Sequence, residues 1–250
     1  MYAVIDTHTH TYLSGHAYST IFENVTVAAE KGLVGIVNTD HSPALSDCRW
    51  PAAVRFLKNV PREYRGVRIY RGVEADVIDF SGRLSVEEPY LSMVDFLIAS
   101  LHDVVIKTGT VEENTVALCG ALQNPHVDIL GHPGNPAFPV DIDTVVQEAA
   151  RQNKLIEINS HSFEARRGCE SNCEVFARAC MKYGVRISLA SDAHACFHVG
   201  EFTNAEALLR KVGFPQELVV TRSMESFEAY LAERRARLAA AQQVQKGTNL

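Results

Sequence analysis

Histidines that follow apolar, strand-like runs are the feature that most constrains this chain. The sequence opens with Ala3-Val-Ile-Asp-Thr-His8-Thr-His10, a short apolar run that leads into two histidines. Residues two apart on a strand point the same way, so both imidazoles can reach one ion. His16 lies in the loop that follows. Further candidates after later apolar runs are His41, Glu74, His102, His132, Asp192 and His194. These nine positions predict a metal site that holds several ions.

Strand-like runs alternate with helical patterns along the chain. Thr20-Ile-Phe-Glu23 predicts a capping box for a helix that ends at Lys31-Gly32. Further helices are predicted at 111–123, 141–152, 170–183 and 204–211, with Gly184 and Gly213 as stops for the last two. The seven predicted strands are 3–5, 34–38, 67–73, 94–99, 127–130, 155–158 and 185–189. Repeated β-then-α order indicates parallel strands with helices outside.

This order predicts an α/β fold, a closed or nearly closed barrel of seven strands. A doubly wound open sheet is the competing architecture, but its glycine-rich phosphate loop after the first strand is missing. In a barrel, residues just past the C-terminal ends of the strands meet at one mouth, which brings the nine candidates together. We expect residues 1–250 to form a single domain, in which 228–250, rich in Ala, Arg and Gln, form an exposed helix and tail.

Composition narrows the function. The formal net charge is −6 and no long cluster of Lys and Arg is present, so we expect no double-stranded nucleic acid partner. A small anionic substrate stays open, because bound divalent ions add local positive charge. The sequence begins directly in a strand, so we expect neither a signal peptide nor a membrane segment. The six cysteines fit a reducing cytoplasm, and the helical pair Cys169 and Cys173 is expected to be inert rather than metal-binding.

The ligand types favour transition metals. Imidazole and carboxylate suit zinc, manganese or iron better than calcium or magnesium, and zinc is the preferred expectation. Taken singly, His16 and His41 have the plainer interpretation of surface or hydrogen-bonded histidines, and Glu74 that of an ion-pair partner. Their shared position after predicted strands favours the metal site.

Other histidines and carboxylates serve as a comparison. His126 precedes a strand, so it is expected at the opposite end of the barrel. His161 follows the sixth strand and is expected to support a ligand or to contact substrate, with a spare ligand as the remaining alternative. His198 lies in the loop after His194, close enough to reach substrate, and has no assigned role. Asp6 shares parity with His8 and is expected to orient an imidazole; the parity of Asp40 points elsewhere.

Six short motifs recur around the candidate ligands: Asp6-Thr-His-Thr-His10, His16-Ala-Tyr-Ser-Thr20, Thr39-Asp-His41, Gly72-Val-Glu74, Gly131-His-Pro-Gly-Asn-Pro136 and Ser191-Asp-Ala-His194. Together they resemble the PHP (polymerase and histidinol phosphatase) superfamily, and most closely its YcdX-like branch of probable phosphatases. His102 and Glu157-Ile-Asn159 add to the resemblance, which runs from residue 2 to about residue 230.

The resemblance implies a distorted (β/α)7 barrel with a trinuclear metal centre. One ion would be held by His8, His10, Glu74 and Asp192. Glu74 would bridge to a second ion held with His102 and His132, and His16, His41 and His194 would hold the third. Glu74, Asp192 and His194 are also expected to take part in catalysis. Relatives suggest a homo-oligomer, with a trimer as the family-level expectation. Ser160-His-Ser-Phe163 departs from the branch's pattern, which leaves substrate preference open.

The expected reaction is hydrolysis of small phosphate monoesters by a metal-activated water. Arg166 and Arg167 either clasp phosphate or form an exposed basic pair. Three alternatives remain: an amidohydrolase-like enzyme acting on C–N or ester bonds, a nuclease, and a non-enzymatic metal-binding module.

Overall fold

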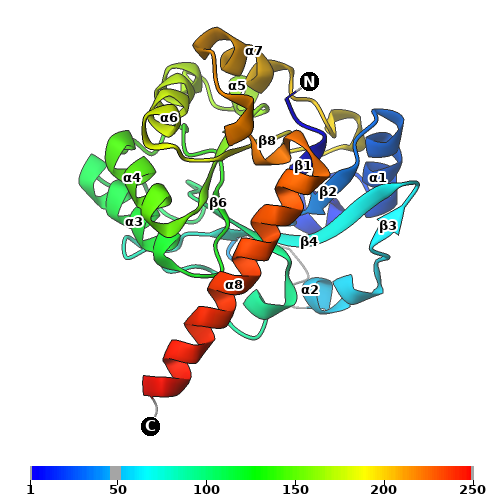
Figure 1. Cartoon of the computed structure of the whole chain (residues 1–250), viewed down its shortest axis with the longest axis horizontal. Coiled ribbons are helices and arrows are strands. Elements are labelled where there is room, and N and C mark those ends of the chain that lie inside the picture. Colours follow the sequence, from blue (N-terminus) through cyan, green and yellow to red (C-terminus); the bar gives the residue numbers. More distant parts are fainter. Residues whose placement is uncertain (1, 46–51, 249–250) are drawn as a thin grey trace.

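Seven parallel strands form a nearly closed barrel in the computed structural model, which describes residues 2–45 and 52–248 (Figure 1). Neighbouring strands pair in the order β1-β2-β4-β5-β6-β7-β8, and a short strand β3 pairs antiparallel with the start of β4. The strands are β1 (Ile5–Thr9), β2 (Gly35–Asn38), β3 (Glu63–Tyr64), β4 (Val67–Asp76), β5 (Phe96–Ser100), β6 (Ile129–Leu130), β7 (Leu155–Asn159) and β8 (Ile187–Ala190). The predicted α/β barrel of seven strands is confirmed.

The first and last strands of the barrel meet without forming a regular ladder. An isolated parallel bridge joins Thr9 to Ala193, and the backbone N–H of His10 donates to the Ala193 carbonyl at 2.9 Å. Deeper in the seam, the hydroxyls of Thr7 and Ser188 lie 2.6 Å apart. These bonds close the barrel at the end where the candidate ligands lie.

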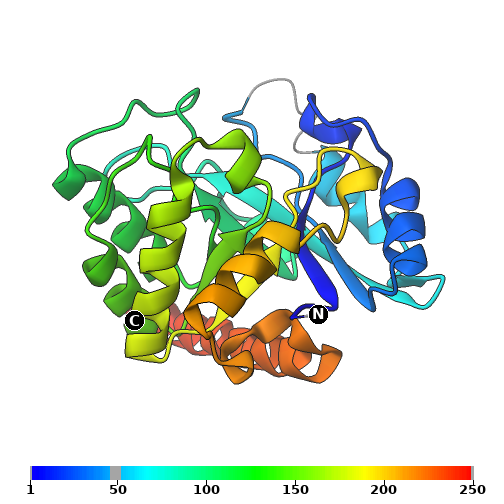
Figure 2. The same cartoon turned by 90° about the horizontal axis from the view of Figure 1, so that it is seen from above.

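Helices cover the outside of the barrel (Figure 2). The capping box of Thr20 and Glu23 begins α1 as predicted, and Gly184 and Gly213 end α6 and α7 in the left-handed conformation. The helices are α1 (Ile21–Glu30), α2 (Ala52–Phe56), α3 (Val111–Gln123), α4 (Ile142–Gln152), α5 (Ser162–Ala165), α6 (Cys169–Tyr183), α7 (Thr203–Val212) and α8 (Met224–Thr248). Short 3₁₀ segments are η1 (Tyr12–Ser14), η2 (Leu57–Asn59), η3 (Leu91–Met93), η4 (Cys196–His198), η5 (Gln216–Leu218) and η6 (Val220–Arg222).

Two strands reach further toward the mouth than predicted. β1 includes His8, and β4 continues past Glu74 to Asp76. The prediction ended each strand where its apolar run ended. In the barrel, however, these polar residues are fully enclosed and keep their place in the sheet; Glu74, for example, pairs in register with Ile98. The site is therefore built on strand residues as well as on the loops after them.

The C-terminal helix α8 corrects the prediction for 228–250. Tyr230, Leu231 and Arg234 are buried, and with Phe227 they follow the i, i+3, i+4, i+7 spacing of an apolar helix face. Phe227 and Tyr230 pack inside the barrel with residues such as Phe96. Figures 1 and 2 show α8 crossing the end of the barrel away from the loops that follow the strands. Exposed positions dominate beyond Arg234, where the helix extends past the other elements.

Two further expectations concern cysteines and membranes. Cys169 and Cys173 are buried, free thiols on α6, whereas Cys48 lies outside the described residues. Within residues 2–45 and 52–248, no helix has the length and apolar character needed to cross a membrane.

Candidate metal centre

The nine predicted ligands gather at the C-terminal ends of the strands, with Glu74 at their centre. Glu74 projects from β4 and is 1% exposed. Its Oε2 lies 2.9 Å from Nδ1 of His41, 3.2 Å from Nε2 of His8 and 3.6 Å from Nε2 of His10. His8 and His10 both come from the end of β1, as the parity of the strand predicted. One carboxylate oxygen thus faces three imidazole nitrogens from two parts of the chain.

The second oxygen of Glu74 faces another pair of imidazoles. Oε1 lies 3.0 Å from Nε2 of His132 and 3.4 Å from Nε2 of His102. It also accepts a hydrogen bond from the Ser100 hydroxyl at 2.6 Å. Because its two oxygens face separate sets of histidines, Glu74 has the geometry of a carboxylate that bridges two ions.

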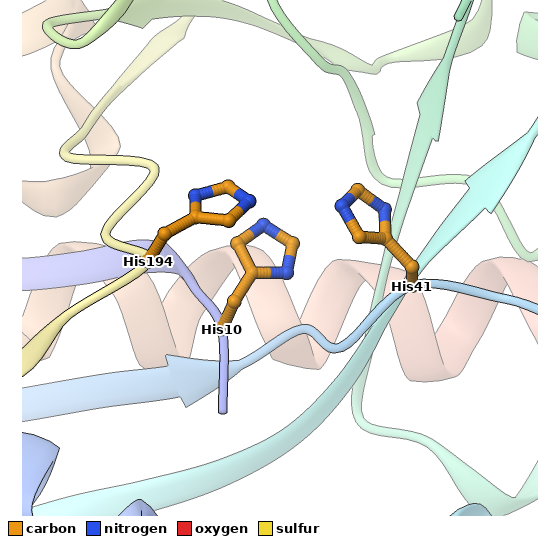
Figure 3. Close-up of side chains that lie close together, drawn as sticks. All are labelled: His10, His41 and His194. Carbon is orange, nitrogen blue, oxygen red and sulfur yellow. The ribbon is translucent and has the colours of Figure 1, made fainter. Parts of the chain in front are cut away.

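Asp192, His16 and His194 complete the group. Asp192 Oδ1 lies 3.3 Å from Nε2 of His10 and 3.6 Å from Nε2 of His8. The Nε2 atoms of His16 and His194 are 3.0 Å apart. In Figure 3 the rings of His10, His41 and His194 reach one shared space from three separate segments, and their ligand atoms lie within 4.8 Å of one another.

Unpaired buried atoms test whether this arrangement suits metal ions. Four buried atoms form no hydrogen bond of acceptable geometry with any described residue, although they face one another: Nε2 of His8, Nε2 of His10, Nδ1 of His41 and Oε2 of Glu74. A buried polar atom without a partner costs about 1–3 kcal/mol, so four of them side by side need an explanation. All four are atoms that coordinate zinc, manganese or iron. The donor set therefore fits divalent cations.

The charge at the centre is also suited to cations. Burial opposes ionisation of Glu74, but His8, His41 and His102 outweigh it and hold the Glu74 pKa well below its usual range. Burial likewise opposes ionisation of Asp192, yet neighbouring histidines and Arg166 hold its pKa well below normal. Both carboxylates are thus anionic at neutral pH.

Two carboxylates to which the sequence assigned no role, Glu157 and Asp76, contact the Nδ1 atoms of candidate ligands and hold their rings in place. Glu157 Oε1 lies 2.7 Å from Nδ1 of His8, and its Oε2 accepts from the backbone N–H of His132 at 2.5 Å. Asp76 Oδ1 lies 2.7 Å from Nδ1 of His102. Burial lowers the pKa of that histidine, but Glu74 and Asp76 outweigh it and raise the pKa to about 10. Strand parity could have indicated Asp76, because it lies two residues after Glu74 on the same strand and points to the same side of the sheet.

The roles predicted for Asp6 and Asp40 are reversed. Asp6 accepts from the hydroxyl of Ser191 at 2.5 Å and from the backbone N–H of Gly200 at 2.8 Å, so it joins loops instead of orienting an imidazole. Asp40 accepts from Ser14 Oγ at 2.7 Å, and that hydroxyl lies 3.1 Å from Nδ1 of His10. Asp40 therefore acts on a candidate ligand through Ser14, which parity alone did not reveal.

Two candidate ligands have an unusual backbone. His132 has φ 31° and Asp192 has φ 53°, both in the left-handed region that side chains other than glycine rarely adopt. Such conformations cost about 1–3 kcal/mol and gather at functional sites, where the surrounding structure enforces them. Both side chains contact other candidate ligands: His132 lies 3.0 Å from Glu74, and Asp192 lies 3.3 Å from His10.

A cavity of about 410 Å³ opens over this centre. Arg166 lines it, and both terminal nitrogens of its guanidinium lie 3.4 Å from Asp192 Oδ2. Ala44, Leu45 and Val104 form an apolar part of the lining. The adjacent Arg167 is exposed, so the structure separates the two predicted arginines.

The remaining histidines lie outside the group of nine candidate ligands. His126 lies near Glu88, with its Nε2 3.3 Å from a carboxylate oxygen, before β6 and away from the mouth, as expected. The ring of His161 is centred 6.3 Å from that of His194, which places it beside the centre. His161 and His198 line a neighbouring cavity of about 420 Å³.

Comparison with known proteins identifies the family. The profile of the PHP domain matches residues 6–161, more than half of the chain. The chain belongs to the PHP domain family. The resemblance inferred from the motifs is confirmed.

Relatives in this family agree along nearly the whole length. A "probable phosphatase" of Acetivibrio thermocellus is 46% identical over 235 residues, which cover 94% of this chain and 98% of the relative. Another from Caldanaerobacter subterraneus subsp. tengcongensis is 45% identical over 241 residues, covering 96% and 95%. The crystal structure of histidinol phosphate phosphatase from Lactococcus lactis, complexed with zinc, L-histidinol and phosphate, has a similar fold (TM-score 0.61, 19% identity, 84% of this chain and 94% of that one).

Proposed function

We propose that this PHP-family protein is a metal-dependent phosphatase that hydrolyses small phosphate monoesters at a centre of three divalent ions. The observation that carries the proposal is the set of unpaired buried donor atoms around Glu74, directly beneath a cavity lined by Arg166. Zinc is the preferred ion, and manganese and iron are compatible with the same ligands.

The distances support a division of the ligands among three positions. His8, His10 and Glu74 form one compact group, together with Asp192. His102 and His132 share Oε1 of Glu74. His16, His41 and His194 form the third group, and the ring centroids of His16 lie 4.9 Å from His41 and 4.8 Å from His194.

The residues of the chain contribute positioning and charge. Divalent ions at such a centre supply a water that ionises near neutral pH and offset the charge of the phosphoryl oxygens. Arg166 can direct N–H donors in the plane of its guanidinium to the substrate phosphate, because its contacts with Asp192 are long and Nη1 stays bonded to Ser162 Oγ at 2.9 Å. Glu74 and Asp192 hold the ligand cluster in place, and His194 lies at the mouth where it can reach the reacting group.

The relatives support this chemistry independently of the geometry. Two proteins that match almost the whole chain are named probable phosphatases. The Lactococcus histidinol phosphate phosphatase, which has a similar fold, was crystallised with zinc, L-histidinol and phosphate. A cytoplasmic location and assembly into a homo-oligomer, a trimer by family resemblance, stay predictions.

Metal analysis by mass spectrometry, paired with a screen of phosphate esters on the same preparation, tests the proposal. We expect about three ions per chain together with ester hydrolysis. Recovery of one ion or none from protein purified without chelators would contradict the trinuclear centre. Turnover of cyclic amides with none of phosphate esters would replace the phosphatase by an amidohydrolase-like enzyme. Full metal loading without any turnover would leave a metal-binding module.

A further inference from the structure

A second polar cavity lies at the opposite end of the barrel. It has a volume of about 280 Å³ and lies between the start of β4, the residue before β5 and helix α8. Arg68 lines it and lies six residues before Glu74 on the same strand. At a rise of about 3.3 Å per residue, the cavity is separated from the metal centre by about 20 Å along that strand.

The lining of this cavity is positively charged although the whole chain carries a net charge of −6. Four arginines face two carboxylates: Arg62, Arg68, Arg234 and Arg235 against Asp95 and Glu228. The carboxylates already have partners. Asp95 forms an ion pair with Arg62 and accepts from the backbone N–H of Arg71, and Glu228 accepts from the Tyr70 hydroxyl at 2.6 Å.

Two of the arginines keep their full hydrogen-bonding capacity. Arg68 and Arg235 are exposed and form no ion pair or side-chain hydrogen bond with any residue in 2–45 or 52–248. A guanidinium offers up to five donors in a planar fork that matches the oxygens of a phosphate. These two side chains are therefore available to an anion in the cavity.

Arg234 holds a positive charge in a fixed position at the wall of the cavity. Its side chain is only 6% exposed, and its Nε donates to Asp128 at 2.7 Å. Its Nη2 is buried and forms no hydrogen bond with a described residue, so it does not face the open cavity. Arg234 therefore contributes charge beside the cavity, and the free donors are those of Arg68 and Arg235.

We propose that this cavity, the arginine pocket of Arg62, Arg68, Arg234 and Arg235, binds a small phosphate-bearing anion. Its volume lies just below that of typical small-molecule sites, about 300–1,000 Å³, so it suits inorganic phosphate or a small phosphorylated compound. The pocket is distinct from the metal centre and does not depend on the proposed phosphatase activity.

Calorimetric titration of metal-loaded protein with inorganic phosphate tests the pocket. Two binding events are expected in the wild-type protein, one at the metal centre and one at the arginine pocket. The double substitution Arg68→Gln with Arg235→Gln removes two exposed, unpaired side chains and should leave the melting temperature unchanged. It should weaken the second event by on the order of tenfold or more, because charge-assisted contacts are lost.

A matched control removes two exposed arginines elsewhere. Arg178→Gln with Arg210→Gln lowers the net charge equally but touches only surface pairs on α6 and α7. This control should keep both binding events, and inhibition of ester hydrolysis by phosphate should be unchanged in both double variants. Phosphate binding that the double substitution Arg68→Gln with Arg235→Gln leaves unchanged would overturn the proposal, whatever happens at the metal centre. Equal loss of the second event in both double variants would also overturn it, since nonspecific charge would then explain the binding.

Discussion

Glu157 Oε1 lies 2.7 Å from Nδ1 of His8, although 149 residues separate the two along the chain. A carboxylate oxygen accepts hydrogen bonds, so Nδ1 of His8 can donate to Glu157. Nε2, the ring atom that lies 3.2 Å from Glu74, is then the atom left to bind a metal ion. The contact between β1 and β7 thus selects the form of the imidazole that can coordinate a metal ion.

Glu157→Gln should therefore lower metal affinity by about 10- to 100-fold, the usual effect of losing a carboxylate that supports a ligand. The amide can still accept from the His132 N–H, so the fold should persist. Metal content after dialysis, measured by mass spectrometry, checks the prediction. Glu148→Gln, which alters a buried carboxylate on α4, is the matched control and should retain its metal. Equal metal content in both variants would contradict the role assigned to Glu157.

Glu74→Gln should have a larger effect, because it replaces a carboxylate that faces five histidines. We expect both metal content and hydrolysis of phosphate esters to fall, since an amide lacks the charge needed to bridge two ions. The two quantities should be measured on one preparation. Wild-type values for both would remove Glu74 from the site.

Arg166→Gln should raise KM for phosphate esters by about tenfold or more while metal content stays at the wild-type level, because we propose that the guanidinium binds the substrate phosphate and is not a metal ligand. Steady-state kinetics with metal analysis provide the measurement. The neighbouring exposed Arg167→Gln is the control. If the two variants share the same KM, Arg166 has no part in phosphate binding.

Removal of the metal should destabilise the folded protein. An ion that binds only the native state stabilises it by about 2.7 kcal/mol when the free ion concentration is 100 times the dissociation constant. For a chain of this size, each kcal/mol corresponds to about 2–4 °C in melting temperature. Treatment with a chelator should thus lower the melting temperature by about 5–10 °C, and added zinc should restore it. An unchanged melting temperature after verified metal loss would show that the centre adds nothing to stability.

Phe227→Ala should destabilise the protein by about 3–5 kcal/mol, because the ring is fully buried between α8 and the barrel strands. Denaturant unfolding measures the loss. Phe22→Ala removes an aromatic ring that is 56% exposed and should change stability by about 0.5 kcal/mol or less. Similar values for the two would mean that α8 does not support the barrel.

The sequence predicted the barrel and the convergence of the nine candidates because both follow from local rules. Alternating apolar runs and helical spacing indicate parallel strands, and parity places His8 beside His10. The same rules did not identify Glu157 or Asp76. Each lies in a buried strand, and the partner that explains it comes from a distant part of the chain: His8 on β1 for Glu157, and His102 after β5 for Asp76.

The error at α8 has a different physical cause. Ala, Arg and Gln dominate 228–250, and composition suggested a solvated helix. The buried face consists of Phe227, Tyr230, Leu231 and Arg234, and one of its members is a charged residue paired with Asp128. A pattern that counts only apolar residues misses such a position, because its burial depends on a partner more than 100 residues away.

The left-handed backbones of His132 and Asp192 have a consequence for how this protein can change. Glycine would adopt either conformation without strain, yet glycine has no side chain to bind a metal ion. At these two positions, therefore, the residue that the backbone favours differs from the residue that the proposed metal site needs. If these residues bind metal as proposed, a relative that no longer binds metal could carry glycine at position 132 or 192 and avoid the backbone strain. Glycine at either position would then mark inactive members of the family.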